Sequence, residues 1–317
     1  MGVTPSRERK PMNAALNRPA PGQRPAWQSC APLLAMAGAV AFSGKAIIVK
    51  LAYRHGVDAI TLIMLRMVVA LPFFLLMLWW AGRGKPALTW RDRGVAAALG
   101  FLGYYLASLL DFLGLQYISA SLERLVLYLT PALVVLLSWG LLGRRAGARQ
   151  WAAMAVGYGG LLLVFGHELR LDGPRVLLGT SLVLASTVSY AAYLLYSGEV
   201  VQRIGSLRLA GWASSVACGL CLAQFALLRP MAGLALLPAP VWWLSLLNGT
   251  LCTVIPVWLV MRAIELMGPA RTAQYGMVGP VSTILLGVLI LGEPFTVWVA
   301  AGSACVLVGV MLLGRGQ

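Results

Sequence analysis

Long apolar runs separated by short polar segments recur from residue 31 to the end of the chain. A transmembrane α-helix needs about 20 mostly apolar residues to cross the hydrocarbon layer of a bilayer. Ten segments approach or exceed that length, near Ala31–Tyr53, Ala59–Ala81, Gly94–Tyr117, Ala120–Leu142, Trp151–Phe165, Val176–Ser197, Leu209–Leu228, Val241–Ile264, Thr272–Leu291 and Phe295–Leu313. The pattern predicts an all-α integral membrane protein with ten transmembrane helices.

Composition supports this prediction and removes one class of partner. Apolar residues make up 60% of the 317 residues and charged residues only 11%, whereas a soluble domain has about 25% charged residues. The net charge is +15, but the basic residues lie between the apolar runs and form no patch with interleaved aromatic residues. This distribution argues against a nucleic-acid partner. Residues 1–30 are polar and rich in proline, which predicts a disordered cytoplasmic tail.

The distribution of lysine and arginine predicts the orientation. With the N-terminus inside, the inside segments hold 15 of the 25 basic residues and the outside loops hold 4. Short cytoplasmic loops carry the excess of positive charge in multi-pass membrane proteins. We therefore expect a multi-pass protein of the cell inner (plasma) membrane with both termini cytoplasmic.

The sequence repeats itself at an offset of 149 residues, which aligns Gly114–Val164 with Ala263–Leu313 without a gap. Pro131 then falls on Pro280, and Gly143 falls on Gly292. Each half contains five predicted spans, and an odd number makes the second copy cross the membrane in the opposite sense. Inverted repeats that hold a substrate near the midplane are a recurring plan of secondary transporters. The expected organisation is the tail, a first repeat over 31–170 and a second over 171–317.

Several short stretches resemble motifs of one family. They are Leu65-Arg66-Met67, Leu129-Thr130-Pro131, Gly268-Pro269-Ala270-Arg271, Gly279-Pro280 and Leu291-Gly292-Glu293-Pro294. Together with the two five-span halves, they resemble the EamA-type members of the drug/metabolite transporter superfamily. The resemblance implies an inverted-repeat fold and transport of metabolites. The first half has Leu142-Gly143-Arg144 where the family has Leu-Gly-Glu, so no role of that glutamate carries over to the first half.

Six ionisable residues lie within the predicted spans of the first half, all in the outer half of the membrane: Lys45, Lys50, Arg66, Asp111, Glu123 and Arg124. Such groups are costly in a bilayer unless they are paired or hydrated, so each is a functional candidate. For Lys50, Arg124 and Arg271 we expect the side chain to reach an interface. Inverted symmetry predicts a counterpart cluster towards the inside, where Arg262, Glu265 and Arg271 lie.

Two interpretations of Lys45 and Asp111 stay open. In one, Lys45 or Arg66 pairs with Asp111 and only fixes helix packing. In the other, the charge faces a cavity and binds substrate. The four cations in the outer half outnumber the two acids, which favours a substrate carboxylate or phosphate as the neutralising group. Asp111 and Glu123 are also candidates for carrying a coupling proton, which the sequence does not decide.

Polar and aromatic residues in several spans complete the expected substrate-binding set: Lys45, Arg66, Tyr104, Asp111, Glu123, Tyr128, Tyr190, Tyr193, Trp258, Gln274 and Tyr275. A proline inside a helix removes one backbone hydrogen bond and frees a carbonyl one turn earlier. We therefore expect hinges at Pro131 and Pro280.

Other classes of function find little support in the sequence. Both histidines, His55 and His167, fall in predicted outer loops, which argues against a histidine-based catalytic site within the membrane. The sequence has no Gly-rich phosphate loop, which argues against ATP-driven transport. The Cys218–Cys221 spacing lies within a span without further ligands, so no metal, cofactor or enzymatic activity is expected. The chain is predicted to be a secondary transporter that exports amino acids or related carboxylates. The alternative is a structural or assembly protein, and a coupling proton and a homodimer are left open.

Overall fold

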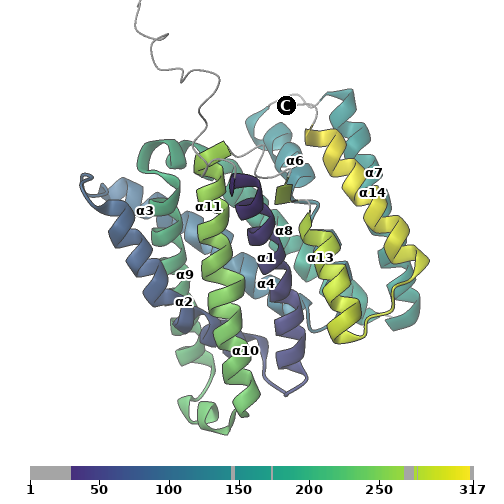
Figure 1. Ribbon diagram of the computed structural model, residues 1–317, viewed down its shortest axis with the longest axis horizontal. Coiled ribbons are helices and arrows are strands. Elements are labelled where there is room, and N and C mark those ends of the chain that lie inside the picture. The colour runs from purple at the N-terminus through teal and green to yellow at the C-terminus, as the bar shows by residue number, and fades with distance from the viewer. Residues whose placement is uncertain (1–29, 144–146, 173, 268–274, 277, 315–317) are drawn as a thin grey trace, which may run out of the picture.

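The computed structural model describes residues 30–143, 147–172, 174–267, 275–276 and 278–314. Within these residues every regular element is a helix, and the long helices run side by side in one bundle (Figure 1). The predicted tail lies outside the described residues, apart from its last residue. The all-α prediction is confirmed for the part of the chain that is described.

In the described part of the chain, seven helical segments are long and apolar enough to cross a membrane: Ala31–Tyr53, Ala59–Gly82, Trp90–Gly114, Ala120–Leu141, Pro174–Gly198, Ser206–Leu228 and Ala239–Val260. Two shorter apolar segments follow, Val278–Leu291 and Val297–Gly309. Each of the ten predicted spans overlaps one of these or the 25-residue helix Ala148–Asp172. The chain is thus a multi-pass membrane protein, and the number of ten spans stays a prediction.

The helices of the first half are α1 (Ala31–Tyr53), α2 (Ala59–Gly82), α3 (Trp90–Gly100), η2 (Phe101–Leu106), α4 (Ala107–Gly114), α5 (Ala120–Leu127), α6 (Thr130–Leu142) and α7 (Ala148–Asp172). Those of the second half are α8 (Pro174–Ile204), α9 (Ser206–Leu228), η3 (Met231–Leu236), α10 (Ala239–Gly249), η4 (Thr250–Val254), α11 (Ile255–Met267), α13 (Val278–Leu286), η5 (Gly287–Leu291) and α14 (Val297–Gly314). The π-helical segments η2 and η4 continue their neighbours, so α3 to α4 and α10 to α11 each form one rod.

Local chemistry fixes where these helices begin and end. The Asp58 carboxylate accepts hydrogen bonds from the first backbone N–H groups of α2, and the Ser119 hydroxyl accepts one from Leu122 N at 3.0 Å at the start of α5. Such side chains satisfy donors that have no partner within the helix. Gly143 and Gly292 end α6 and η5 with φ values of 64° and 71°, a conformation that glycine adopts without strain. These two glycines are 149 residues apart, like the repeat itself.

Helix packing follows the same twofold plan. The closest partner of α7 is α14, and that of α2 is α9, so equivalent helices of the two halves pack on each other. The contact of α1 with α11 is matched by that of α8 with α4, and the contact of α1 with α13 is matched by that of α8 with α6. In Figure 1, α7 and α14 form one edge of the bundle and α1 lies between α11 and α13. The two-repeat architecture is therefore visible in the packing.

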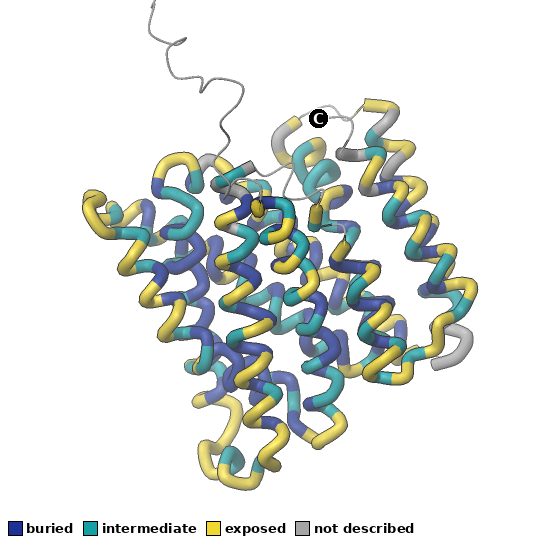
Figure 2. Tube along the Cα trace, in the orientation of Figure 1, coloured by how far each residue is buried: buried dark blue, intermediate teal, exposed yellow. Residues whose placement is uncertain are grey.

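The outward faces of the bundle are apolar. Exposed positions line the outer sides of the long helices, whereas buried positions face the interior (Figure 2). The exposed side chains include Trp80, Leu162, Trp243 and Leu289. An exposed apolar belt of this kind on a bundle of long helices fits contact with lipid tails, since water would be an unfavourable neighbour.

Two equivalent glycines allow close approaches between the halves. A Cβ atom at Gly100 would lie 2.4 Å from the carbonyl oxygen of Ala213 in α9. A Cβ atom at Gly249 would lie 2.7 Å from Cγ1 of Val69 in α2. Each glycine directly precedes a π-helical segment, η2 or η4, and π-helical turns occur frequently at functional sites. The offset of 149 residues therefore extends to these rods.

We predict that Gly100→Ala destabilises the protein, because the new methyl group must push α3 away from the backbone of α9. The expected cost is about 1–3 kcal/mol, the usual range for overpacking. Gly94→Ala in the same helix is the matched control, since a Cβ atom at Gly94 would meet nothing within 4 Å and alanine favours the helix. Melting of both variants in detergent tests this, and equal melting temperatures would show that the close approach is not needed.

Candidate functional site

A cavity of about 470 Å³ lies among the helices of both halves. This volume falls within the range of small-molecule sites in proteins. Its lining comes from α1, α2, η2, α4, α5, α6, α8, α9, η4, α11 and α13, so almost every long helix contributes except α7 and α14. The cavity is therefore central to the two-repeat bundle.

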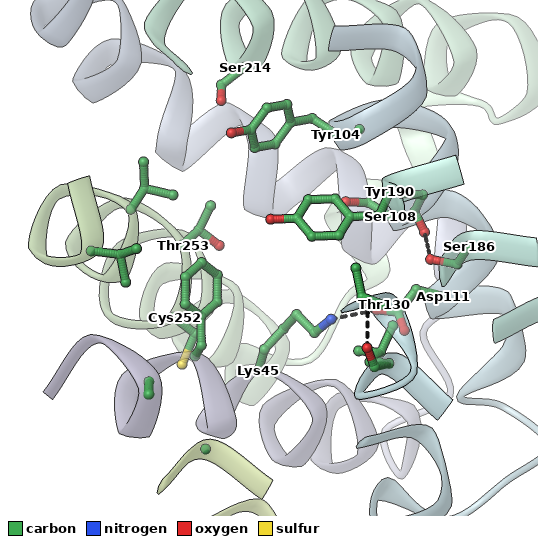
Figure 3. Close-up of a pocket in the computed structure, with 18 of the residues that line it drawn as sticks. Lys45, Tyr104, Ser108, Asp111, Thr130, Ser186, Tyr190, Ser214, Cys252 and Thr253 are labelled. Atoms are coloured by element: carbon green, nitrogen blue, oxygen red, sulfur yellow. Dashed lines mark hydrogen bonds and ion pairs between the residues drawn. The ribbon is translucent and has the colours of Figure 1, made fainter. Parts of the chain in front are cut away.

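An ammonium group and two carboxyl groups form the centre of the site. Lys45 Nζ in α1 lies 2.5 Å from Asp111 Oδ2 in α4 and 3.4 Å from Glu123 Oε1 in α5. Figure 3 shows the Lys45 side chain extending across the cavity towards Asp111. Lys45 and Asp111 line the cavity, whereas Glu123 lies behind its wall with a side chain that is 0% exposed. The structure thus brings together three residues that the sequence singled out.

The hydrogen bonds of this cluster are incomplete. Among the described residues, neither oxygen of Glu123 has a hydrogen-bond partner, and Oδ1 of Asp111 also lacks one. The Arg66 guanidinium stacks over the Phe112 ring at 4.6 Å from its centroid and leaves its Nε unpartnered. Buried polar groups without partners are costly and require an explanation. In a cavity wall, a ligand, water or a proton can supply the missing partner.

Arg124 contradicts the expectation that it reaches an interface. Its Nε donates to Thr283 Oγ1 in α13 at 2.8 Å, and its Nη2 donates to the Phe42 carbonyl in α1 at 3.1 Å. The side chain lines the cavity. The reason is local, because a hydroxyl of the second half and a backbone carbonyl of α1 provide acceptors inside the bundle. Arg124 therefore joins Lys45 and Arg66 as a cation of the site.

Three tyrosines form an aromatic wall. The hydroxyl groups of Tyr104 in η2 and Tyr193 in α8 are 3.2 Å apart, and the rings of Tyr190 and Tyr193 stack with centroids 5.6 Å apart. Tyr104 and Tyr190 line the cavity, while Tyr193 lies behind them and is buried. Gly103 makes room for this arrangement, since a Cβ there would lie 2.4 Å from the Tyr193 ring.

Both prolines of the repeat free a carbonyl that a nearby hydroxyl then satisfies. The helix is interrupted between α5 and α6, just before Pro131. There the Thr130 Oγ1 donates a hydrogen bond to the Leu127 carbonyl at 2.5 Å. The Gly276 carbonyl, one turn before Pro280, accepts the Tyr128 hydroxyl at 2.8 Å. Tyr128 therefore links the two proline-containing segments. The cavity is lined by Leu127, Tyr128, Thr130 and Gly276 but not by the two prolines.

Other expected site residues lie elsewhere. Trp258 is exposed and lines a small separate pocket with Trp80, Leu207 and Arg262. Tyr275 is exposed and is not among the residues that line the central cavity. Gln274 and Arg271 lie outside the described residues, as does the side chain of Glu265. The expected inner counterpart cluster is thus described only at Arg262.

Small polar residues of the cavity were missed by the sequence reasoning. They are Ser108, Thr130, Ser186, Ser214, Cys252 and Thr253. Ser108 lies one helical turn after Tyr104, and Ser186 one turn before Tyr190, so the signal was a polar stripe at helical spacing. Within the described residues, no three His, Cys, Asp or Glu side chains are grouped so that they could hold a metal ion.

The end of the bundle near the charged cluster is tied together by polar contacts between the halves. The Glu293 carboxylate accepts from Ala120 N at 2.7 Å and from the Ser121 hydroxyl at 2.8 Å, so it caps the start of α5. Arg54 donates to the Leu291 carbonyl at 2.8 Å. A carboxylate at a helix N-terminus is favoured by the helix dipole as well as by hydrogen bonds. Glu293, the glutamate of the second-half Leu-Gly-Glu-Pro motif, therefore links the second half to the start of α5 in the first half.

Comparison with known proteins supports a transporter. Two stretches, residues 30–166 and 177–315, match the EamA-like transporter family. The chain is 31% identical over 263 residues to the uncharacterized transporter YcbK of Bacillus subtilis, covering 81% of this chain and 83% of that protein. It is 25% identical over 282 residues to the uncharacterized transporter YetK of the same organism, covering 88% and 85%.

A solved crystal structure shows the same fold. It aligns with 90% of this chain and 99% of its own with a TM-score of 0.62, at 18% identity. That identity supports the fold alone. The family match covers nearly the whole described chain in two copies, in agreement with the paired packing of the halves. The chain belongs to the EamA-like transporter family and is a multi-pass membrane transporter.

Proposed function

We propose that the protein is a secondary transporter of the cell inner membrane that exports small carboxylates, amino acids or their relatives, by alternating access between two inverted repeats. The observation that carries this proposal is the Lys45 ammonium, which lines a central cavity beside acids with unfilled hydrogen bonds. An ammonium so placed has one hydrogen-bonded partner, Asp111, and donors to spare, since it carries three N–H groups.

The charges that line the cavity favour an anionic substrate group. Lys45, Arg66 and Arg124 line it as cations, against Asp111 as the one lining carboxylate among the described residues. An excess of positive charge in a poorly hydrated site attracts an anion strongly. The apolar side chains of the lining and the rings of Tyr104 and Tyr190 suit the rest of a small metabolite.

The broken and widened helices suit a conformational cycle. Pro131 and Pro280 are proposed as hinges, and the Tyr128 hydroxyl, which donates to the Gly276 carbonyl, would coordinate them. Discontinuous helices in equivalent positions of the two halves commonly mark the binding site of inverted-repeat transporters. Opening of the outer end would require release of the Glu293 contacts to the start of α5.

The alternative is a structural or assembly protein in which the charges only fix helix packing. The short Lys45–Asp111 contact is the observation that favours it. A purely structural role does not explain a cavity of about 470 Å³ that is lined by three cations. It also predicts that the charged residues have no effect on solute movement, which separates it from transport.

The proposed orientation predicts that a cysteine placed at Gly147 is cytoplasmic and one at Gly233 is external. Both would be tested in a background in which the native cysteines are replaced by serine. A membrane-impermeant maleimide added to intact cells should label the Gly233 site and leave the Gly147 site unlabelled until the membrane is opened. The reverse pattern would contradict the orientation and the inverted repeat built on it.

Lys45→Met should reduce carboxylate transport about tenfold or more, because the change removes the charge and keeps the volume. Hydrogen bonds to charged groups contribute about 1.5–3 kcal/mol, and 1.4 kcal/mol is a factor of ten in affinity. The matched control is Lys85→Met, at an exposed position between α2 and α3. If Lys45→Met inserts, melts and transports like the wild type, Lys45 does not bind the substrate.

Counterflow in proteoliposomes tests the substrate class. Vesicles are loaded with amino acids, organic acids or neutral sugars, and entry of the same labelled solute is followed, with protein-free vesicles as control. We expect exchange of one or more carboxylates. Exchange of a neutral sugar with no response to any acid would remove the carboxylate proposal and leave the transporter family assignment intact.

A further inference from the structure

Glu123 is a carboxyl group enclosed within the bundle. Its side chain is fully buried and does not line the cavity, and neither of its oxygens has a hydrogen-bond donor among the described residues. An ionised carboxylate in such a place is expensive unless it is paired and hydrogen-bonded. Its nearest cation, Lys45 Nζ, is 3.4 Å away and already bonded to Asp111 at 2.5 Å.

One proton could link the two acids in a hydrogen bond. Glu123 and Asp111 are neighbours, since Lys45 Nζ lies 3.4 Å from Glu123 Oε1 and 2.5 Å from Asp111 Oδ2. Oδ1 of Asp111 is an unpartnered acceptor among the described residues. A protonated Glu123 gains an O–H donor, which could occupy that acceptor. Two carboxyl groups that share a site commonly hold a single proton between them, because like charges at short range repel. Asp111 lines the cavity, so a proton can arrive from water there.

Several charged groups surround the two acids. Glu123 and Asp111 face Lys45 from α1, Arg66 from α2 and Arg124 on α5 itself, and the Tyr53 hydroxyl of α1 is near Asp111. The Cys252 thiol of η4 is near the three cations. From α13, the neutral Thr283 hydroxyl accepts a hydrogen bond from Arg124. Glu293, which follows η5, accepts one from Ala120 N at the start of α5. The cations oppose protonation of the acid pair, whereas burial favours it.

We propose that Asp111 and Glu123 form a proton-binding site that fills when a substrate carboxylate binds Lys45, so that carboxylate and proton cross the membrane together. This inference rests on the proposed carboxylate transport. A bound carboxylate draws Lys45 away from the acids and adds a negative charge beside them. Both effects favour protonation, and by linkage the proton favours carboxylate binding to the same degree.

The step is balanced without any further reactant. A hydronium ion in the cavity water gives its proton to a carboxylate oxygen of the Asp111–Glu123 pair, an O–H bond forms, and water is left. On release of the substrate, Lys45 returns to the acids and the proton leaves to water. For a monocarboxylate the net movement is that of the uncharged acid, so the transport step carries no net charge.

Calorimetric binding measurements on the purified full-length protein test the coupling. The probes are the carboxylates that exchange in the counterflow assay, titrated across a pH series in buffers with different ionisation enthalpies, which reports the protons taken up per carboxylate. The variants are Glu123→Gln, which keeps the shape and cannot hold the proton as a carboxylate, and Glu123→Asp, which keeps an acid. Asp92→Asn is the matched control, since Asp92 pairs with Arg203 away from the cavity.

We expect the wild type and Asp92→Asn to take up as much as one proton per carboxylate, with a maximum within the pH series. Glu123→Gln should bind carboxylate without this uptake, and Glu123→Asp should retain part of it. Carboxylate binding without proton uptake at any pH, or equal uptake in Glu123→Gln, would overturn the inference while leaving carboxylate transport standing. Absence of carboxylate binding would overturn the proposed function and the inference with it. If Glu123→Gln does not fold, the wild-type pH series still decides.

Discussion

An ammonium group in the interior of a membrane bundle must be compensated, and here two carboxyl groups from separate helices compensate it. Lys45 in α1 contacts Asp111 in α4 and Glu123 in α5, so three helices of the first half converge on one charge. Burying charges costs more than most contacts return unless geometry and hydrogen bonding are nearly complete. In this cluster they are incomplete. These unfilled hydrogen bonds support the proposal that the cluster exchanges partners when a substrate binds.

The same need for satisfied polar groups shapes the backbone around the cavity. In lipid, every N–H and C=O group needs an internal partner, and irregular backbone is tolerated only where protein or a cavity surrounds it. The carbonyls of Leu127 and Gly276 meet hydroxyls of Thr130 and Tyr128. The interruption before Pro131 and the Gly276 carbonyl therefore lie at the cavity wall, where side-chain hydroxyls satisfy the freed carbonyls. Gly100 permits the close helix packing that surrounds this wall.

Much of the fold follows from the sequence because the bilayer imposes a simple rule on it. The apolar runs locate the helices, and the register of Pro131 with Pro280 reveals the repeat that the packing displays. The pairing of Lys45 with Asp111 agrees with one of the two interpretations of the sequence, since each charge is costly to leave alone in lipid. The contact of Glu123 with Lys45 did not follow from the sequence. The direction in which a side chain points does not follow. The Arg124 side chain points inward, where the Thr283 hydroxyl and the Phe42 carbonyl accept its hydrogen bonds. Trp258 is exposed, although its helix, α11, packs against α1.

The central claim is that the cavity recognises a carboxylate through Lys45, and ligand-induced stabilisation of the purified protein tests it most directly. A ligand that binds only the folded state raises the melting temperature with its concentration. The experiment compares small carboxylic acids with their uncharged amides, which are nearly identical in shape, in the wild type and in Lys45→Met. The account predicts a rise in melting temperature with acids alone, and its loss in the variant. Equal stabilisation by acid and amide, or an undiminished acid effect in Lys45→Met, would contradict it.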